Sequence, residues 1–132
     1  MITKIQEIVE KMSGELSGIL GAAVVSINDG LSIAESGKAG TFKTAAASAY
    51  LASIVKANAK AINLLNDAEV IEDIIITTSQ SHFIVRHVPG QPFFVFLMTE
   101  KGEWLGKARM AIRKYEKDLA RYEEFLREQF SE

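Results

Sequence analysis

Two segments of this chain are apolar at nearly every position, and they constrain the fold more than any other feature. They are ILGAAVVSI, residues Ile19–Ile27, and FFVFLM, residues Phe93–Met98. A strand with one face in water alternates apolar and polar residues, whereas a strand buried on both faces reads as a continuous apolar run. We therefore expect a sheet whose central strands are covered on both sides, and amphipathic helices can provide that cover.

The remaining segments supply helices and further strands around these two runs. Asn28-Asp29-Gly30 follows the first run and favours a tight hairpin, because glycine tolerates a positive φ angle. Apolar spacing and β-branched composition predict helices over Ile2–Leu16, Phe42–Asn66 and from about Glu103 to Phe130, and strands over Leu31–Ser36, Val70–Ser79 and His82–Val88.

The predicted order is therefore α-β-β-α-β-β-β-α. Because hairpin-sized turns join neighbouring strands, we expect an α+β three-layer sandwich: a five-stranded, mostly antiparallel sheet with helices on both faces. A chain of 132 residues suits a single core. We expect one domain over residues 1–120 and a charged helical C-terminal extension of the last helix over residues 121–132.

Composition excludes several classes of function. The net charge of −2 argues against a nucleic-acid partner, which is bound through a basic stripe. The absence of cysteine excludes disulfides and thiolate metal sites, and it favours a reducing, cytoplasmic location. The first residues carry charges every few positions and do not form a signal peptide. No apolar run approaches the roughly 20 residues that span a bilayer, so membrane insertion is not expected.

The stretch after the second strand superficially suggests a phosphate-binding loop. The nucleotide-binding P-loop needs two glycines separated by four residues, followed directly by Lys and Ser or Thr. Here Gly37 and Gly40 are three positions apart, and Lys43 follows Phe42 rather than a glycine. We interpret this stretch as a loop in which Thr41 caps the following helix.

Other chemistry-bearing residues have simpler structural explanations. His82 and His87 are five apart on one predicted strand, so they point to opposite faces and cannot share a metal. The carboxylates near the third strand are interpreted as solvated edge charges: Glu69, Glu72 and Asp73. No serine lies in a Gly-x-Ser-x-Gly elbow. We therefore expect no catalytic residue, cofactor or metal, and no enzymatic activity.

The central helix carries two candidate faces. The apolar face expected to lie on the sheet comprises Tyr50, Leu51, Ile54, Ala57, Ala61, Leu64 and Leu65. The opposite face, together with Asn63, comprises Ala45, Ala49, Ala52, Lys56, Ala59 and Lys60. Small side chains let another backbone approach closely, so we interpret this face as a partner-binding surface. The alternative is that alanine is present only as the best helix former.

The strand Val70–Ser79 is expected at a sheet edge. A long apolar edge invites pairing with another chain, and its candidate residues are Ile71, Ile74, Ile75 and Ile76. Pairing with the same strand of a second copy would make one continuous sheet and bring the two alanine-rich helices side by side. The sequence therefore predicts a homodimer.

The last helix has apolar residues spaced by three and four: Leu105, Ala108, Ile112, Tyr115, Leu119, Tyr122 and Leu126. We expect its first half to cover the sheet. After Leu119, packing on the core and an extension that meets a partner are both compatible with the pattern.

Taken together, these segments resemble the roadblock family, which includes roadblock-type dynein light chains and MglB-type regulators of Ras-like GTPases. The resemblance runs over about residues 3–118 and rests on the order and spacing of four segments. They are GILGAAVVSINDGLSIAESG, AAASAYLASIVKANAKAINLL, EDIIITTSQSHFIVRHV and FFVFLMTEKGEWLGKARMAIRKYEKDL. The charged tail from Arg121 to Glu132 departs from it, because it continues beyond the usual domain end.

The resemblance implies a roadblock/profilin-like fold, a dimer through the third strand and the central helix, and a helix-pair face that docks a small GTPase or serves as a scaffold. It implies that GTP hydrolysis is altered by reshaping the GTPase, so no catalytic residue transfers to this chain. Two other functions stay open at this point. They are an adaptor subunit with no effect on GTP turnover, and a small-molecule sensor, for which the apolar strands offer no evident polar specificity groups.

Overall fold

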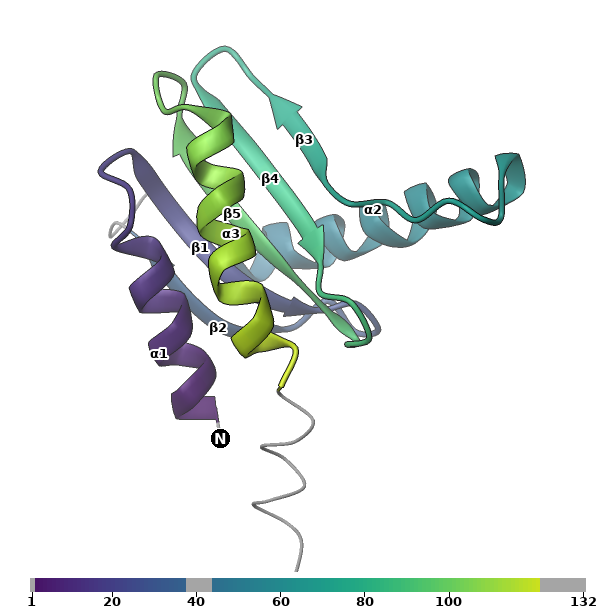
Figure 1. The fold of residues 1–132 in the computed structure, drawn as a ribbon, viewed down its shortest axis with the longest axis horizontal. Coiled ribbons are helices and arrows are strands. Elements are labelled where there is room, and N and C mark those ends of the chain that lie inside the picture. The colour runs from purple at the N-terminus through teal and green to yellow at the C-terminus, as the bar shows by residue number, and fades with distance from the viewer. Residues whose placement is uncertain (1, 38–43, 122–132) are drawn as a thin grey trace, which may run out of the picture.

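The computed structural model describes residues 2–37 and 44–121 of the chain. Its elements follow the predicted order (Figure 1). They are α1 (Ile2–Ser13), β1 (Ile19–Ser26), β2 (Ser32–Gly37), α2 (Thr44–Leu65), β3 (Ile74–Thr77), β4 (Ser81–His87), β5 (Phe93–Glu100) and α3 (Leu105–Leu119).

The strands form one five-stranded sheet in the order β2-β1-β5-β4-β3, and every neighbouring pair is antiparallel. The two apolar runs, β1 and β5, therefore lie side by side near the middle of the sheet, with Val24 opposite Val95. Strands buried on both faces need cover on both faces, and the three helices provide it. The predicted α+β sandwich is confirmed.

One face of the sheet is covered by α1 and α3, which stand next to each other in front of it (Figure 1). Helical spacing brings Ile5, Val9 and Met12 of α1 onto this face, and all three are fully buried. Ala108, Ile112 and Leu119 of α3 lie on the same face and are also fully buried. These side chains, with the inward residues of β1, β4 and β5, make the larger of two apolar cores.

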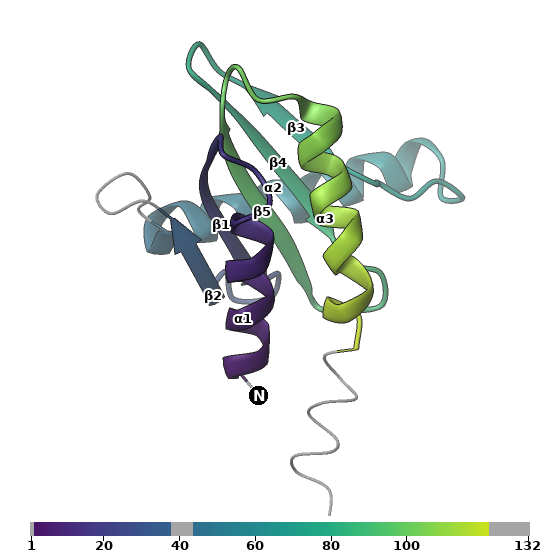
Figure 2. The same ribbon diagram turned by 60° about the vertical axis from the view of Figure 1, so that its left-hand side comes forward.

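The other face is covered by α2, which crosses behind the sheet in both views (Figures 1 and 2). Its smaller core joins Leu51, Ala52 and Val55 to residues of the sheet, which include Phe94 and Phe96. The ring of Phe96 also stacks on that of Phe83, with centroids 5.9 Å apart.

Several element ends differ from their predicted positions. The strand predicted over Val70–Ser79 is only four residues long, because its ladder with β4 begins at Ile74 opposite Val85. The last helix begins at Leu105, because Trp104 before it has an extended backbone (φ −71°, ψ 123°). The carboxylate of Glu103 accepts a hydrogen bond from the Gly18 N–H (3.0 Å). The helix ends at Leu119, with Ala120 as its C-cap. Thr41 and residues 122–132 of the proposed extension lie outside the described residues.

Candidate functional site

The rotation of α2 on the sheet differs from the predicted one. Ala52, expected on the partner-binding face, is only 2% exposed and packs on the sheet beside Leu51. Tyr50, expected on the sheet, is 75% exposed. The helix is apolar almost all round, so its spacing identifies a helix but fixes the inward side poorly. Ala52 is therefore removed from the candidate surface.

Four other residues of the predicted face are exposed: Ala49, Lys56, Ala59 and Lys60. Ala45 lies in α2, but its side chain is outside what the structure describes. Near Ala49 the helix backbone comes very close to the β1–β2 turn, since a Cβ on Gly30 would lie 2.8 Å from the Ala49 Cα. This approach sets the N-terminal half of α2 against the turn.

The C-terminal half of α2 runs out beyond β3, away from the sheet (Figures 1 and 2). Leu64, Leu65 and Val70 are between 80% and 85% exposed there. A hollow of about 510 Å³ lies between this half of the helix and the segment that leads into β3. Val55, Ile62, Val70, Ile71 and Ile74 are among the residues that line it. Large apolar side chains gathered around a hollow are typical of an interaction surface.

The edge position of β3 is confirmed, because β3 is the last strand in the sheet order. Ile74, Ile75 and Ile76 belong to this strand, whereas Ile71 precedes it and does not. Ile74 packs toward the α2 side of the sheet. Because strand side chains alternate, Ile75 points to the α3 side, where it is 40% exposed. Within the described chain, no strand pairs with the outer edge of β3.

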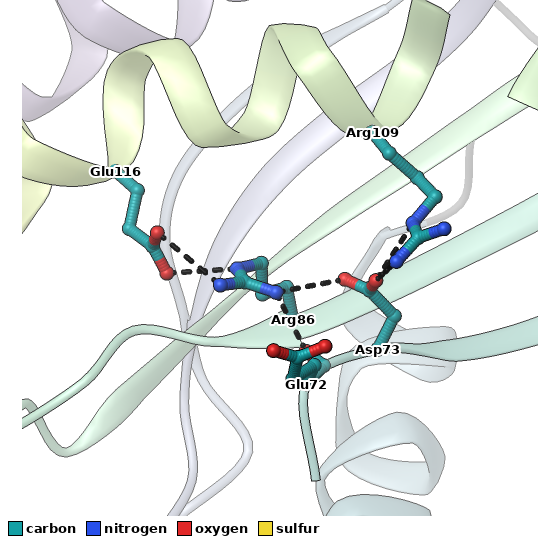
Figure 3. A network of polar contacts seen from close by, with 5 residues as sticks. All are labelled: Glu72, Asp73, Arg86, Arg109 and Glu116. Atoms are coloured by element: carbon teal, nitrogen blue, oxygen red, sulfur yellow. Dashed lines mark hydrogen bonds and ion pairs between the residues drawn. The ribbon is translucent and has the colours of Figure 1, made fainter. Parts of the chain in front are cut away.

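An ion network, shown in Figure 3, holds the segment before β3 in place. Asp73 accepts from Arg86 Nη1 (3.2 Å) and from Arg109 Nε (2.8 Å). Arg86 also donates to Glu116 on α3 (2.8 Å from Nε) and to the Glu72 carbonyl (3.2 Å). The hydrogen bond to Glu116, followed by that to Asp73, raises the pKa of Arg86 despite partial burial. The side chain of Asp73 is only 6% exposed, so its interpretation as a solvated edge charge is wrong.

Sequence reasoning missed this network because its members are far apart in the chain. Arg86 lies 30 residues from Glu116, and Asp73 lies 36 residues from Arg109. One signal was available, since Arg86 interrupts an apolar strand that the sheet order places under α3. A cation in such a position needs a carboxylate partner.

Both histidines have structural partners, as expected from the sequence. The His82 ring donates from Nε2 to the Lys101 carbonyl (3.1 Å), and its Nδ1 pairs with the Thr77 hydroxyl (3.3 Å). His87 donates from Nε2 to the Gln91 carbonyl (2.6 Å). Over residues 2–37 and 44–121, no group of three His, Asp or Glu side chains is placed to hold a metal ion. In the same ranges, no helix has the length and apolar character needed to cross a bilayer.

Comparison with known proteins identifies the fold. No protein-family model matches the sequence, and no curated protein sequence matches it. Solved structures do match. Myxococcus xanthus MglB aligns with a TM-score of 0.82 at 18% identity, over 95% of this chain and 91% of MglB.

Two further structures agree with this result. An MglB in a tetrameric arrangement aligns with a TM-score of 0.80 at 17% identity, over 91% of this chain and 88% of that one. A Roadblock/LC7 domain from Streptomyces avermitilis aligns with a TM-score of 0.79 at 11% identity, over 89% of this chain and 95% of that one. The chain therefore has the roadblock/LC7 fold.

Proposed function

We propose that this chain, which has the roadblock/LC7 fold, is a non-enzymatic homodimeric module that binds and regulates a small Ras-like GTPase. The observation that carries the proposal is the surface of α2, where a long helix leaves small and apolar side chains uncovered along its length. Ala49, Lys56, Ala59 and Lys60 are exposed on this helix, and Leu64 and Leu65 follow them beyond the sheet. A helix covered on only part of its surface fits a fold completed by another chain.

The proposed homodimer forms through the exposed edge of β3. Antiparallel pairing of β3 with β3 of a second copy, about a two-fold axis perpendicular to the sheet, would make the sheet continuous. The same axis places both α2 helices on one side, where the exposed apolar end of each helix can be covered. Ile74, Ile75 and Ile76 form the pairing edge, and Ile71 contributes from the hollow beside α2.

The proposed partner of the dimer is a small Ras-like GTPase, which binds the paired α2 helices. The paired α2 helices present Ala49 and Lys56, with Ala45 as a further candidate, on the side of the sheet away from α1 and α3, and Ala59 and Lys60 continue this surface at the edge of the hollow beside β3. Small side chains let a partner backbone approach closely, while Lys56 and Lys60 supply charge that can orient it. The sequence resemblance to MglB-type regulators supports a Ras-like GTPase as that partner, in the cytoplasm. The GTPase contributes the nucleotide and the catalytic groups, and this module alters their arrangement.

The test uses the full chain and the small Ras-like GTPases encoded in the same genome. We expect one of them to bind, and its GTP hydrolysis rate to change when the chain is added. Lys56→Glu with Lys60→Glu should weaken binding by about tenfold or more, as reversed charges do at an interface. The matched control, Lys107→Glu with Lys117→Glu, makes the same charge change on the opposite face of the sheet and should bind as wild type does.

The outcomes separate the proposed functions. Binding without any change in hydrolysis or exchange would favour the adaptor alternative. If none of the GTPases binds, the proposed partner class is wrong. Sedimentation of both double variants checks that each still has the oligomeric state of the wild type.

A further inference from the structure

We propose that the outer face of α3 binds an anionic phospholipid surface. This face, called the basic face below, consists of Lys107, Met110, Arg113 and Lys117, all of them exposed. It lies on the side of the sheet opposite α2, so it is distinct from the proposed GTPase-binding surface. The inference uses the proposed dimer only to place two such faces together.

The periodicity of α3 separates an apolar inner side from a cationic outer side. Ala108, Ala111, Ile112 and Leu119 point inward and are 6% exposed or less. The exposed residues of α3 lie between them at helical spacing, and four of the seven are basic: Lys107, Arg113, Lys114 and Lys117. Met110, which is 71% exposed, lies at the centre of this outer side and has Lys107, Arg113, Lys114 and Lys117 around it.

The basic face carries charge that the other described residues, within 2–37 and 44–121, do not neutralise. Arg109 is paired with Asp73, and Lys114 is paired with Glu15 (2.6 Å). Glu116 is occupied by Arg86. Lys107, Arg113 and Lys117 have no ion pair or hydrogen bond from their side chains to other described residues, and Asp118 is the exposed acid of this helix. This local excess of positive charge occurs in a chain whose net charge is −2.

Two exposed apolar side chains accompany these charges. Met110 lies among the lysines, and Trp104 is 78% exposed at the N-terminal end of the helix. Long lysine and arginine side chains can extend to lipid headgroups while an apolar side chain enters the boundary with the acyl region. Tryptophan is favoured at that boundary because its ring is apolar and its N–H is polar.

The shape of this surface favours a lipid over a protein partner. Two hollows, of about 510 and 850 Å³, lie beside the segment leading into β3, and neither is lined by a residue of the basic face. The basic face is the exposed outer side of a single helix. An exposed cationic helix can lie along a broad anionic surface, whereas binding to a protein depends mainly on anchors buried in pockets.

The proposed dimer would place two basic faces on the same side. A two-fold axis perpendicular to the sheet keeps both α3 helices opposite the α2 pair. Because α3 packs over β4 and β5 while α1 packs over β1 and β2, the two α3 helices lie nearer the axis. The outer surface of α1 is farther away and of mixed charge, with Glu7, Glu10 and Lys11 exposed. The dimer would then hold a GTPase on one side and rest on lipid with the other.

The experiment is co-sedimentation of the full-length protein with vesicles. One set contains phosphatidylcholine alone, and the other contains equal parts of phosphatidylcholine and phosphatidylserine. We expect the protein to sediment only with the second set, and less so as salt is added. Each cation near an anionic surface contributes roughly fivefold to the affinity, so Lys107→Gln, Arg113→Gln and Lys117→Gln together should reduce it by about a hundredfold. All three side chains are exposed, and glutamine has a similar helix propensity.

The matched control is Lys56→Gln with Lys60→Gln, which removes positive charge from α2 and should leave vesicle binding unchanged. GTPase binding is measured on the same variants. The triple variant should retain it, so a failed GTPase proposal and a failed lipid proposal give different results. Equal sedimentation of the triple variant and the wild type would overturn the inference, as would no sedimentation of the wild type with either set. Tighter binding of soluble polyglutamate than of the vesicles, or a changed oligomeric state in the triple variant, would assign the face to a protein partner instead.

Discussion

At the scale of single residues, the Asp73 carboxylate joins three elements. It precedes β3 and accepts hydrogen bonds from Arg86 on β4 and Arg109 on α3 (Figure 3). Arg86 is oriented by Glu116 from the other side, through two hydrogen bonds of 2.8 and 3.4 Å. A guanidinium held by carboxylates on both sides fixes the positions of its partners, because its donors lie in one rigid plane.

We expect Asp73→Asn to lower the free energy of unfolding by about 2 kcal/mol, because it removes one charge from a largely buried network and leaves two arginines partly unpaired. Arg109 is 40% exposed and can regain water, and this limits the loss. Urea unfolding measures this change in the free energy of unfolding.

The matched control for Asp73→Asn is Glu72→Gln, at the neighbouring residue in the sequence. Arg86 uses the Glu72 carbonyl rather than its carboxylate, so a similar loss in both variants would contradict this assignment.

A second local interaction of charged groups involves the Glu15 carboxylate, at the surface between α1 and α3. The Lys114 ammonium (2.6 Å) and then the Tyr115 hydroxyl (2.7 Å) donate to its carboxylate and lower its pKa below the ordinary 4.5. A carboxyl whose pKa is lowered by folding stabilises the fold above its unfolded pKa. That contribution disappears as the pH falls below 4.5 and through the lower, folded pKa.

We therefore expect the side-chain NMR signal of Glu15 to titrate below pH 4.5 in the wild type. Lys114→Met should move the midpoint upward, because it removes the largest cause of the shift. Lys117→Met removes a charge of the same helix that does not contact Glu15, and it should leave the midpoint near that of the wild type. Equal midpoints in all three proteins would contradict the assignment.

At the scale of elements, α2 is positioned by a close approach at its N-terminal half. Gly30 in the β1–β2 turn has φ +71°, and a Cβ there would lie 2.8 Å from the Cα of Ala49. Both the left-handed conformation and the missing side chain are needed at this position. The turn therefore fixes the position of the N-terminal half of α2, and the C-terminal half of the helix extends past β3.

Gly30→Ala should lower the free energy of unfolding by about 2 kcal/mol or more, since strain from positive φ adds to a clash with helix backbone. Gly90→Ala separates the two effects. Gly90 has φ +77°, but a Cβ there would have nothing within 4 Å, so its loss of about 1 kcal/mol reports conformational strain alone. Thermal or urea unfolding measures both. Equal losses of unfolding free energy in the two variants would mean that the close approach to Ala49 adds nothing to the destabilisation by Gly30→Ala.

The sequence predicted the elements more successfully than their contacts. The order of strands and helices followed from local patterns, because β1 and β5 are apolar at almost every position and α1 and α3 have clear apolar stripes. The rotation of α2 did not follow, since alanines surround the helix and its phase depends on the contact with Gly30. The start of β3 did not follow either, because it depends on how Arg86 holds Glu72 and Asp73. Contacts between distant residues leave no local pattern.

At the scale of the whole molecule, the two faces of the sheet differ in how completely they are covered. On one side α1 and α3 stand together and enclose the larger core. On the other side α2 covers the sheet with only part of its length, and Leu64, Leu65 and Val70 remain exposed near the uncovered edge of β3. One additional copy of the chain could cover both the helix end and the strand edge. That one partner could cover both exposed regions is the main physical reason to propose a homodimer with its two α2 helices on one side.

The substitution Ile75→Lys tests the dimer directly. Ile75 lies in β3 and is 40% exposed, so the monomer fold can accommodate a lysine, while a pairing edge would have to bring two such charges together. We expect sedimentation equilibrium to show a dimer for the wild type and a monomer for the variant at the same concentration. Leu31→Lys is the control, since Leu31 is 66% exposed near β2, at the opposite edge of the sheet. Circular dichroism establishes that both variants are folded, and a folded Ile75→Lys protein that stays dimeric would exclude pairing through β3.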